Sequence, residues 1–398
     1  MKHLLTALLT AALLLSLTAC GQQEVPAAPA EPEAPVEEAI PAPPPPTREE
    51  LEAQQIQDLL DAMSLEERVG QLFFPRCPAD SAVEDVSTYH LGGYILFGRD
   101  FKDASDNWLT QDQLVSTLSG YQAAAEIPLL IGVDEEGGTV VRASRNPNLR
   151  ERKFQSPQAV FAQGGMEAIL ADTAEKDALL HRIGINVNLA PVADLSTDPA
   201  DFIYDRSFGQ GVEATSAYVS QVVGQMAADS MGSVLKHYPG YGNNVDTHTG
   251  IAVDPRPLEQ FQTADLLPFA AGQEASHGTA AVLVSHNIIT ALDPTLPASL
   301  SPAVHDLLRD QLGDVVAMTD DLAMDAVAAY AEDGSVAVLA LAAGNDLIIT
   351  SDYRTQIPLV IQAYEDGTLD PLELQAKCRR VLEWKQALGL LPPVEGID

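Results

Sequence analysis

The chain has 398 residues and a formal net charge of −35, from 57 acidic and 22 basic side chains. This charge excludes a nucleic-acid-binding function, because such binding depends on neutralisation of phosphates by lysine and arginine. It also argues against electrostatic attachment to an anionic membrane surface. The three cysteines, Cys20, Cys77 and Cys378, are too few for a disulfide framework or a four-cysteine metal site, although one bridge between Cys77 and Cys378 stays open.

The first twenty residues have the pattern of a secretion signal. A short polar start precedes an apolar run over residues 4–17, which is too short for an ordinary membrane-spanning helix. The next residues, LTACG at 17–21, resemble the lipobox of bacterial lipoproteins, where the cysteine becomes the mature N-terminus and carries a diacylglycerol anchor. We therefore expect residues 1–20 to be a lipoprotein signal peptide and Cys20 to be lipidated. The alternative is an ordinary signal peptide with a chance cysteine.

Residues 21–50 are rich in proline, alanine and glutamate. Proline removes backbone donors and restricts φ, so we expect an extended, semi-rigid tether here. Such a tether would hold a globular body clear of a membrane. Together with the lipobox, it predicts an extracytoplasmic protein anchored to the cell membrane or the outer membrane.

The remainder, residues 51–398, alternates short apolar runs with longer amphipathic ones. This rhythm predicts an α/β fold, specifically a (β/α)8 TIM barrel in one catalytic domain, with a doubly wound open sheet as the alternative. The predicted strands are 69–75, 92–98, 128–134, 185–195, 232–238, 280–286, 314–320 and 345–350. Helices are expected at 109–126, 167–184 and 258–275.

Most of these apolar runs end in ionisable or hydrogen-bonding residues. In a barrel the carboxyl ends of the strands form the active face, so these residues should converge on one mouth. They are Asp134, Glu135, Glu136, Asp194, Lys236, His237, Ser285, His286, Asn287, Asp320 and Asp321.

Several chemistries can be compared with this set. The chain has no Gly-x-Ser-x-Gly nucleophile elbow, and its DEEGG segment lacks the spacing of a phosphate-binding loop. A metal site remains an alternative, but the cation of Lys236 would lie within it, and no HExxH motif occurs. The possible metal ligands are His237, Asp246, His248, His286 and Asp320.

Glycoside hydrolysis fits the same residues with fewer requirements. It needs a carboxylate that bonds the anomeric carbon and a proton donor at the leaving oxygen. Asp320, at the tip of the seventh predicted strand, can be the nucleophile. Asp246 and His248 can be the acid/base pair, because a carboxylate beside a histidine orients it and raises its pKa.

Two segments, KHYPGYGNNVDTHTG from residue 236 and VVAMTDDLAM from residue 315, resemble the signature regions of glycoside hydrolase family 3, specifically its β-N-acetylglucosaminidase branch. The resemblance extends in family order through 63–74, 92–101, 133–138, 188–195, 205–209 and 340–348. It implies a barrel, a retaining mechanism without cofactor or metal, and an amino-sugar oligosaccharide substrate. We expect a monomer.

Residue by residue, the resemblance implies that Asp320 is the nucleophile and that Asp246 and His248 are the acid/base dyad. It implies sugar contacts from Asp134, Arg142, Arg206, Lys236 and His237. Glu135 and Asp321 are expected to be structural or solvent-facing rather than catalytic. His286 either lines the site or caps its strand.

The chain departs from the family pattern at three points. Tyr241 replaces a second histidine, the loop before the dyad is one residue shorter, and Thr139 stands where an arginine is common. These departures leave the dyad in place and concern substrate preference and loop motion. From the family resemblance and the lipobox, we expect the substrate to be peptidoglycan or chitin-like fragments with terminal β-linked N-acetylhexosamine. A β-glucosidase or β-xylosidase of the same family and a non-catalytic sugar-binding lipoprotein are the alternatives.

Overall fold

A computed structural model describes residues 45–244, 252–324, 327, 330 and 335–394, and by its internal contacts the chain from Pro46 to Asp398 forms one compact unit. The predicted lipidation site Cys20 and the predicted dyad, Asp246 and His248, lie outside the described residues. Within the described part, no helix has both the length and the apolar character needed to cross a bilayer.

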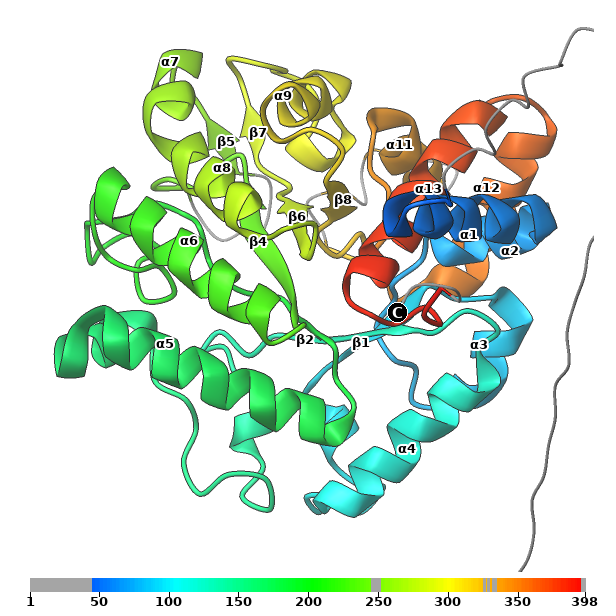
Figure 1. Ribbon diagram of the computed structural model, residues 1–398. Coiled ribbons are helices and arrows are strands. Elements are labelled where there is room, and N and C mark those ends of the chain that lie inside the picture. Colours follow the sequence, from blue (N-terminus) through cyan, green and yellow to red (C-terminus); the bar gives the residue numbers. More distant parts are fainter. Residues whose placement is uncertain (1–44, 245–251, 325–326, 328–329, 331–334, 395–398) are drawn as a thin grey trace, which may run out of the picture. The chain divides into compact units, whose positions relative to one another are not determined.

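Six parallel strands form a curled sheet at the centre of this unit (Figure 1). They follow one another in the sheet in the same order as in the chain, with no reversal point. A doubly wound sheet would reverse its strand order, so that alternative is not supported. The strands are β1 (Gly93–Leu96), β2 (Leu130–Val133), β3 (Val187–Asn188), β4 (Gly232–Tyr238), β6 (Ala280–Val284) and β8 (Val316–Thr319).

Single-residue parallel bridges extend the sheet beyond its two edge strands. Met318 of β8 pairs with Leu347, the next residue Ile348 pairs with Phe73, and Arg76 pairs with Ile95 of β1. The fold is therefore a TIM-barrel-like α/β arrangement.

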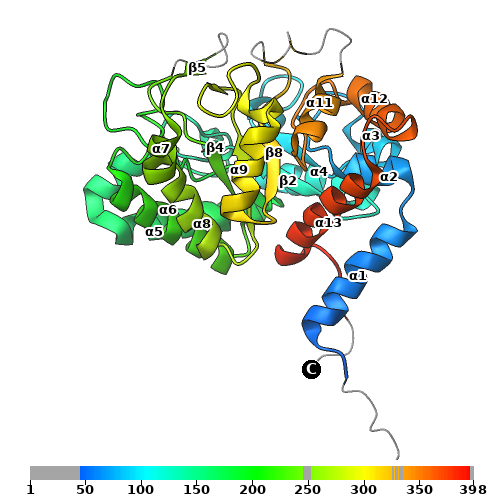
Figure 2. The same cartoon turned by 90° about the horizontal axis from the view of Figure 1, so that it is seen from above.

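Helices connect successive strands and form the outer layer around the sheet (Figures 1 and 2). The connecting helices are α4 (Gln111–Ala124), α5 (Pro157–Ile183), α6 (Val212–Ala228), α7 (Leu258–Gln260) with α8 (Leu266–Ala275), and α9 (Pro302–Leu312). The remaining helices are α1 (Arg48–Ala62), α2 (Leu65–Gln71), α3 (Ala82–Tyr89), α11 (Val336–Ala343), α12 (Tyr353–Glu365) and α13 (Pro371–Ala387). Both α1 and α2 pack against α13 (Figure 2).

The strands are buried on both sides, which explains their continuous apolar sequences. Every residue of β1, β2, β4, β6 and β8 is buried. Parallel strands covered by helices on their outer face show this pattern, whereas a half-exposed sheet would alternate. The prediction of buried parallel strands is confirmed.

Three predicted strands are wrong in extent. The range 69–75 begins inside α2, because Ser64 and Glu67 form a capping box that starts a helix running to Gln71. Only residues 187–188 of the range 185–195 form a strand, with one further bridge at Val192. The range 345–350 contributes only the bridges at residues 347 and 348.

The helix predictions are closer to the structure. The predicted helix 109–126 matches α4, and 258–275 is covered by α7, a π-helical segment at Phe261–Asp265, and α8. The predicted start at 167 differs from the start of α5 at Pro157. Gly164 and Gly165 have non-helical dihedral angles, so the chain kinks just before the predicted start.

The folded unit begins earlier than residue 51. Thr47 accepts a hydrogen bond from the backbone N–H of Glu50, whose carboxylate accepts one from Thr47 N–H in return. This capping box starts α1 at Arg48, three residues inside the range expected to be tether.

Candidate active site

A pocket of about 480 Å³ opens at the carboxyl ends of the strands, and it contains all six of the predicted site residues that the structure describes. Ligand pockets in proteins are commonly of this size. Its polar lining is Arg76, Asp134, Thr139, Arg142, Arg206, Lys236, His237, Asp320 and Asp321. Its apolar lining is Ile95, Phe97, Val140, Leu189, Phe202, Leu283, Met324 and Ile349.

The strands place these side chains at one mouth. Asp134 directly follows β2, Lys236 and His237 lie near the end of β4, and Asp320 directly follows β8. Parallel strands in register bring their carboxyl ends to one edge, which is why residues distant in the chain meet here. The prediction that Asp134, Lys236, His237 and Asp320 lie together is confirmed, because all four line the same pocket.

Lys236 lies at the centre of a buried network of charges. Its Nζ is 2.7 Å from Oδ1 of Asp134 and 2.6 Å from Oε1 of Glu136, and the residue is 2% exposed. Burial acts to lower the pKa of Lys236, but the two carboxylates outweigh it and raise the pKa above its usual value. The ammonium group is therefore charged and held in one position.

Arg206 comes from the connection between β3 and α6. Its Nε and Nη2 donate to the two carboxylate oxygens of Glu136 at 3.0 and 2.8 Å, and its Nη2 lies 3.2 Å from Nε2 of His237. Burial favours a raised pKa for Glu136, yet the charges of Arg206 and Lys236 prevail and hold that pKa below its usual range. Glu136 thus balances two cations from beneath the pocket.

His237 is oriented by a buried carboxylate. Oδ2 of Asp194 accepts from the His237 backbone N–H at 3.0 Å and lies 2.7 Å from its Nδ1, while Asp194 is 1% exposed. A proton on Nδ1 leaves Nε2 facing Arg206 as an acceptor. The other oxygen of Asp194, Oδ1, accepts from Tyr241 N–H at 2.7 Å.

Arg142 is held both by a hydrogen bond from its backbone N–H and by an ion pair of its guanidinium group. Its guanidinium Nη2 is 3.6 Å from Oδ2 of Asp134, and its backbone N–H donates to Glu135 at 2.9 Å. Glu135 also accepts from Ala143 and Ser144 N–H, so it fixes the start of this segment. Burial raises the pKa of Glu135, against these hydrogen bonds. The prediction that Glu135 is structural is confirmed.

A tight turn lets the chain pass from β2 to this segment. Gly137 has φ +102°, and a Cβ there would lie 2.1 Å from the carbonyl oxygen of Gln155. Only glycine fits this position. Glu136, before the turn, pairs with Arg206 and Lys236, and Thr139, after it, lines the pocket.

Asp320 lies beside a second ion pair. One of its carboxylate oxygens accepts from Asp321 N–H at 2.8 Å. Asp321 is buried and pairs with Arg76, whose guanidinium stacks 4.4 Å from the centre of the Phe97 ring. Asp321 is therefore a structural partner of Arg76, which was not among the predicted site residues, and Asp321 also lines the pocket.

His286 does not line the pocket. It is fully buried, with Nδ1 2.7 Å from Oγ of Ser299 and Nε2 3.1 Å from the carbonyl oxygen of Asp321. Its role is to connect the end of β6 with the segment after β8.

Two residues of the site, Glu136 and Asp194, were in the predicted strand-end set but were not assigned to the site. A signal was present, since each carboxylate lies at or shortly after the end of an apolar run, where a buried charge requires an ion partner. The partners themselves lie 70 and 43 residues away in the chain.

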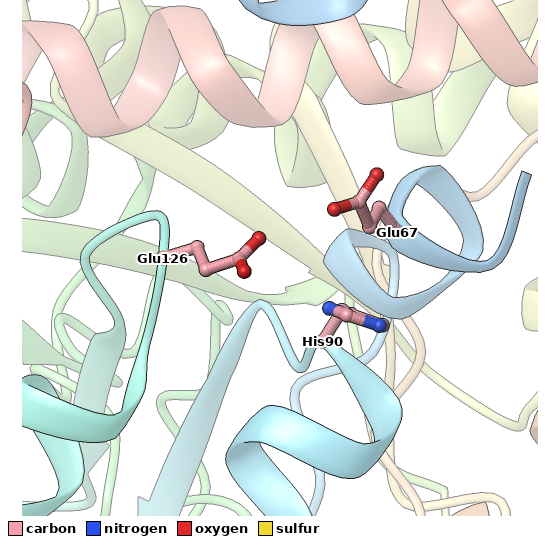
Figure 3. Close-up of side chains that lie close together, drawn as sticks. All are labelled: Glu67, His90 and Glu126. Carbon is pink, nitrogen blue, oxygen red and sulfur yellow. The ribbon is translucent and has the colours of Figure 1, made fainter. Parts of the chain in front are cut away.

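Among the described residues, one group has the composition of a metal site. Ligand atoms of Glu67, His90 and Glu126 lie within 4.8 Å of one another (Figure 3). They come from α2, from the residue after α3 and from the connection before β2, and they line a different pocket of about 230 Å³. This group therefore does not belong to the pocket of Asp320.

The chain was compared with known proteins. The family model for the glycosyl hydrolase family 3 N terminal domain matches residues 64–384. A β-hexosaminidase of Xanthomonas oryzae pv. oryzae (strain MAFF 311018) is 35% identical over 242 residues, covering 59% of this chain and 69% of that protein. A β-hexosaminidase of Stenotrophomonas maltophilia (strain R551-3) is 34% identical over 244 residues, with the same coverage.

Solved structures give the same family. A glycoside hydrolase family 3 β-N-acetylglucosaminidase from Paenibacillus sp. str. FPU-7 matches with a TM-score of 0.74 at 28% identity, over 83% of this chain and 63% of that chain. The chain thus spans less than two thirds of that structure's length. A β-N-acetylhexosaminidase from Beutenbergia cavernae DSM 12333 matches with a TM-score of 0.71 at 28% identity, over 81% of this chain and 99% of that chain.

These comparisons confirm the resemblance predicted from the motifs. The matched range contains every residue of the pocket described above. The chain belongs to glycoside hydrolase family 3, and it is a glycoside hydrolase.

Proposed function

We propose that the chain is a retaining exo-β-N-acetylglucosaminidase that removes terminal β-linked N-acetylhexosamine. The observation that carries the proposal is the position of Asp320, which follows β8 and shares one pocket with Asp134, Arg206, Lys236 and His237. A carboxylate facing a cluster of fixed donors and acceptors suits a sugar whose hydroxyls need both kinds of partner.

In the proposed reaction, Asp320 attacks the anomeric carbon and the bond to the leaving oxygen breaks. Asp246 and His248, which lie outside the described residues, form the acid/base dyad that protonates that oxygen. Water, deprotonated by the same dyad, then attacks the anomeric carbon and releases Asp320 from the glycosyl-enzyme intermediate.

The remaining residues hold the sugar. Asp134 accepts hydrogen bonds from sugar hydroxyls, and Lys236, Arg206 and Arg142 donate to them. Lys236 contacts Asp134 at 2.7 Å and Arg142 lies 3.6 Å from it, so these groups need little rearrangement to bind.

An assay with p-nitrophenyl glycosides tests the activity. We expect hydrolysis of the N-acetyl-β-glucosaminide, and not of the β-glucoside or β-xyloside, with no loss after chelation of metal ions. Turnover of the glucoside or xyloside would favour the β-glucosidase or β-xylosidase alternative. Sugar binding without turnover of any of the three would favour a binding lipoprotein, and loss on chelation a metal mechanism.

The nucleophile is tested by Asp320→Asn, which should lower kcat by about 10³-fold or more because a neutral amide cannot form the glycosyl ester. Asp314→Asn is the matched control, since this exposed residue precedes the same strand at its opposite end. Mass spectrometry of acid-quenched enzyme should find the sugar on the peptide that contains Asp320. An unchanged rate in Asp320→Asn would refute the assignment.

We propose peptidoglycan fragments as the substrate, with chito-oligosaccharides as the other outcome. The support is the expected extracytoplasmic location together with the family. Relative kcat/KM for a muropeptide with terminal N-acetylglucosamine and for chitobiose decides between them.

The membrane anchor is a separate proposal. It rests on the lipobox-like sequence ending at Cys20 and the proline-rich residues 21–50. The full chain should partition into the detergent phase on cloud-point separation, and Cys20→Ala should move it to the aqueous phase. Equal partitioning of both would refute lipidation.

The complete (β/α)8 barrel is likewise proposed, with Phe73 and residues 347–348 in the two positions between β8 and β1. Phe74 N–H donates to the carbonyl of Ile348 at 2.9 Å, and Ile348 N–H donates to the carbonyl of Leu72 at 2.8 Å. Amide exchange at Phe74 and Ile348 should be as slow as in β2, and fast exchange would argue for an open sheet.

A further inference from the structure

After β4 the chain leaves the pocket through a turn at Gly240 and Tyr241, and hydrogen bonds to His237 and Asp194 hold this turn in place. Gly240 N–H donates to the carbonyl of His237 at 2.8 Å, and Tyr241 N–H donates to Asp194. Gly240 has φ +126°, and a Cβ there would lie 2.7 Å from Asp265. The position of this turn is thus tied to the carboxylate that orients His237.

Arg256 holds the same turn from its outer side. Its Nη2 donates to the carbonyl of Gly240 at 3.2 Å, its Nη1 to Oδ1 of Asp265 at 2.8 Å, and its Nε and Nη2 to Oδ2 of Asp254 at 2.9 and 2.7 Å. The three side chains are largely buried, with exposed fractions of 15% for Arg256, 3% for Asp265 and 1% for Asp254. One guanidinium therefore joins three separate parts of the chain.

Asn244 completes the connection. Its Nδ2 donates to Oδ2 of Asp254 at 2.9 Å and to the carbonyl of Tyr241 at 2.9 Å. The strand β5 (Val253–Asp254) pairs with β7 (Ile288–Ile289), which follows β6. The chain before residue 245 and the chain after residue 251 are therefore bonded to each other, and the latter also pairs with β7 in a separate two-stranded sheet.

We propose that Arg256 is a positioning residue for proton transfer in the glycosidase reaction. This inference rests on the proposed function, in which Asp246 and His248 are the acid/base dyad. Arg256 sets the separation and direction of the two chain ends from which residues 245–251 extend. It does so through Asp254, Asp265 and Gly240, and it does not contact the sugar.

The shape of the guanidinium is essential to this role. A planar guanidinium can donate from three separate nitrogens to two carboxylates and a carbonyl at once, whereas the three donors of an ammonium all lie on one nitrogen and cannot span the same distances. Arg256→Lys keeps the charge between Asp254 and Asp265 but loses the simultaneous contact with Gly240. The rate of proton donation to the leaving oxygen should then fall more than the other steps, because it depends most steeply on the position of the donor.

Leaving-group dependence provides a readout that a purely structural role would not change. A 2,4-dinitrophenyl glycoside needs little protonation to depart, whereas a phenyl glycoside depends on it. For Arg256→Lys we expect kcat/KM for phenyl N-acetyl-β-glucosaminide to fall about tenfold or more, and that for the dinitrophenyl substrate to change less than about threefold.

Arg309→Lys is the matched control. Arg309 also joins a buried carboxylate, Asp346 at 2.6 Å, to backbone carbonyls, those of Val315 and Gly344, but these partners do not belong to the chain segments next to residues 245–251. Its replacement should lower the melting temperature without altering the ratio of the two rates. Equal losses on both substrates in Arg256→Lys, or no loss on either, would overturn the proposal.

Asn244→Ala is the second variant, which applies even if Arg256→Lys does not fold. It removes one neutral hydrogen-bonding side chain and should produce the same selective loss to a smaller extent. An unchanged rate ratio in a folded Asn244→Ala variant would count against the proposal. If wild-type protein hydrolyses neither glycoside, the proposed function fails first; if it hydrolyses both, only the Arg256 inference is under test.

Discussion

Glu136 and Arg206 form a two-point ion pair beneath the pocket, with Nε and Nη2 of the arginine donating to separate oxygens of the glutamate. Side-chain exposure is 2% for Glu136 and 16% for Arg206. A buried pair of this kind stabilises little relative to an apolar pair, but removal of one partner leaves the other charge uncompensated.

We therefore predict that Glu136→Gln lowers the free energy of unfolding at pH 7 by about 3 kcal/mol, measured by urea denaturation. The pKa of Glu136 is below its ordinary value of 4.5 in the folded chain. Its stabilising contribution is thus present above pH 4.5 and is lost as pH falls further. Wild-type protein should lose more stability than the variant below pH 4.5. Glu151→Gln, at an exposed site, is the control, and parallel pH curves for Glu136→Gln and wild type would contradict the prediction.

Asp194→Asn tests how His237 is oriented. An amide cannot replace a carboxylate that accepts from His237 N–H and from Tyr241 N–H while also facing the ring Nδ1. We expect kcat/KM to fall about 10- to 100-fold, because a small displacement of a positioning group has effects of this size. Asp198→Asn, in the exposed part of the same segment, should be near wild type. A wild-type rate in Asp194→Asn would show that the ring is held by other contacts.

The burial of Lys385 leads us to predict that the free energy of unfolding depends on pH, for a reason unrelated to catalysis. It is fully buried, with Nζ 2.7 Å from Oε1 of Gln71, and burial lowers its pKa from 10.5 to about 7. The unfolded state therefore binds more protons between pH 7 and pH 10.5, so this residue makes stability rise with pH across that window. The gain amounts to about 5 kcal/mol.

The measurement is the difference in unfolding free energy between wild type and Lys385→Met. The variant should be more stable at pH 7, and its advantage should shrink toward pH 10. Lys153→Met, at an exposed site, should show no such trend. A constant difference across the window would show that Lys385 is not forced toward neutrality.

The two cysteines of the folded unit are free, which settles the bridge left open by the sequence. Both are buried, and burial raises the pKa of Cys77 and of Cys378 to about 12. The thiolate is the reactive form. Native protein at pH 8 should therefore leave both unlabelled by a disulfide reagent, and unfolding in guanidinium chloride should release two reactive thiols, counted separately from Cys20. Rapid labelling in the native state would contradict this burial.

Sequence reasoning located the mouth of the site because one rule connects strand ends with function. Asp134, Lys236 and Asp320 each follow or end an apolar run, and parallel strands bring such ends together. It did not assign Glu136 or Asp194 to the site, because their importance depends on partners from other strands. Ion pairing across the sheet is a tertiary property that no local pattern encodes.

The predicted limits of the strands were wrong where helix capping or the absence of a pairing partner, and not the apolar sequence, determined the local structure. Ser64 and Glu67 extend a helix into the apolar run at 69–71, and a run such as 185–195 can be buried without pairing as a strand. Tyr241, noted as a departure from the family, also has a physical role. Its ring packs 5.6 Å from those of His237 and Phe202, in space that a histidine would fill differently.

Glu135 fixes the position of the segment that carries Arg142 without depending on the side chains of that segment. It captures Arg142, Ala143 and Ser144 through their backbone N–H groups, which every residue type except proline provides. Apart from Glu136 and Gly137, the residues between Glu135 and Arg142 can therefore change while the arginine keeps its place. Thr139 and Val140, which line the pocket there, are positions where drift or directed evolution can alter sugar preference without dismantling the active face.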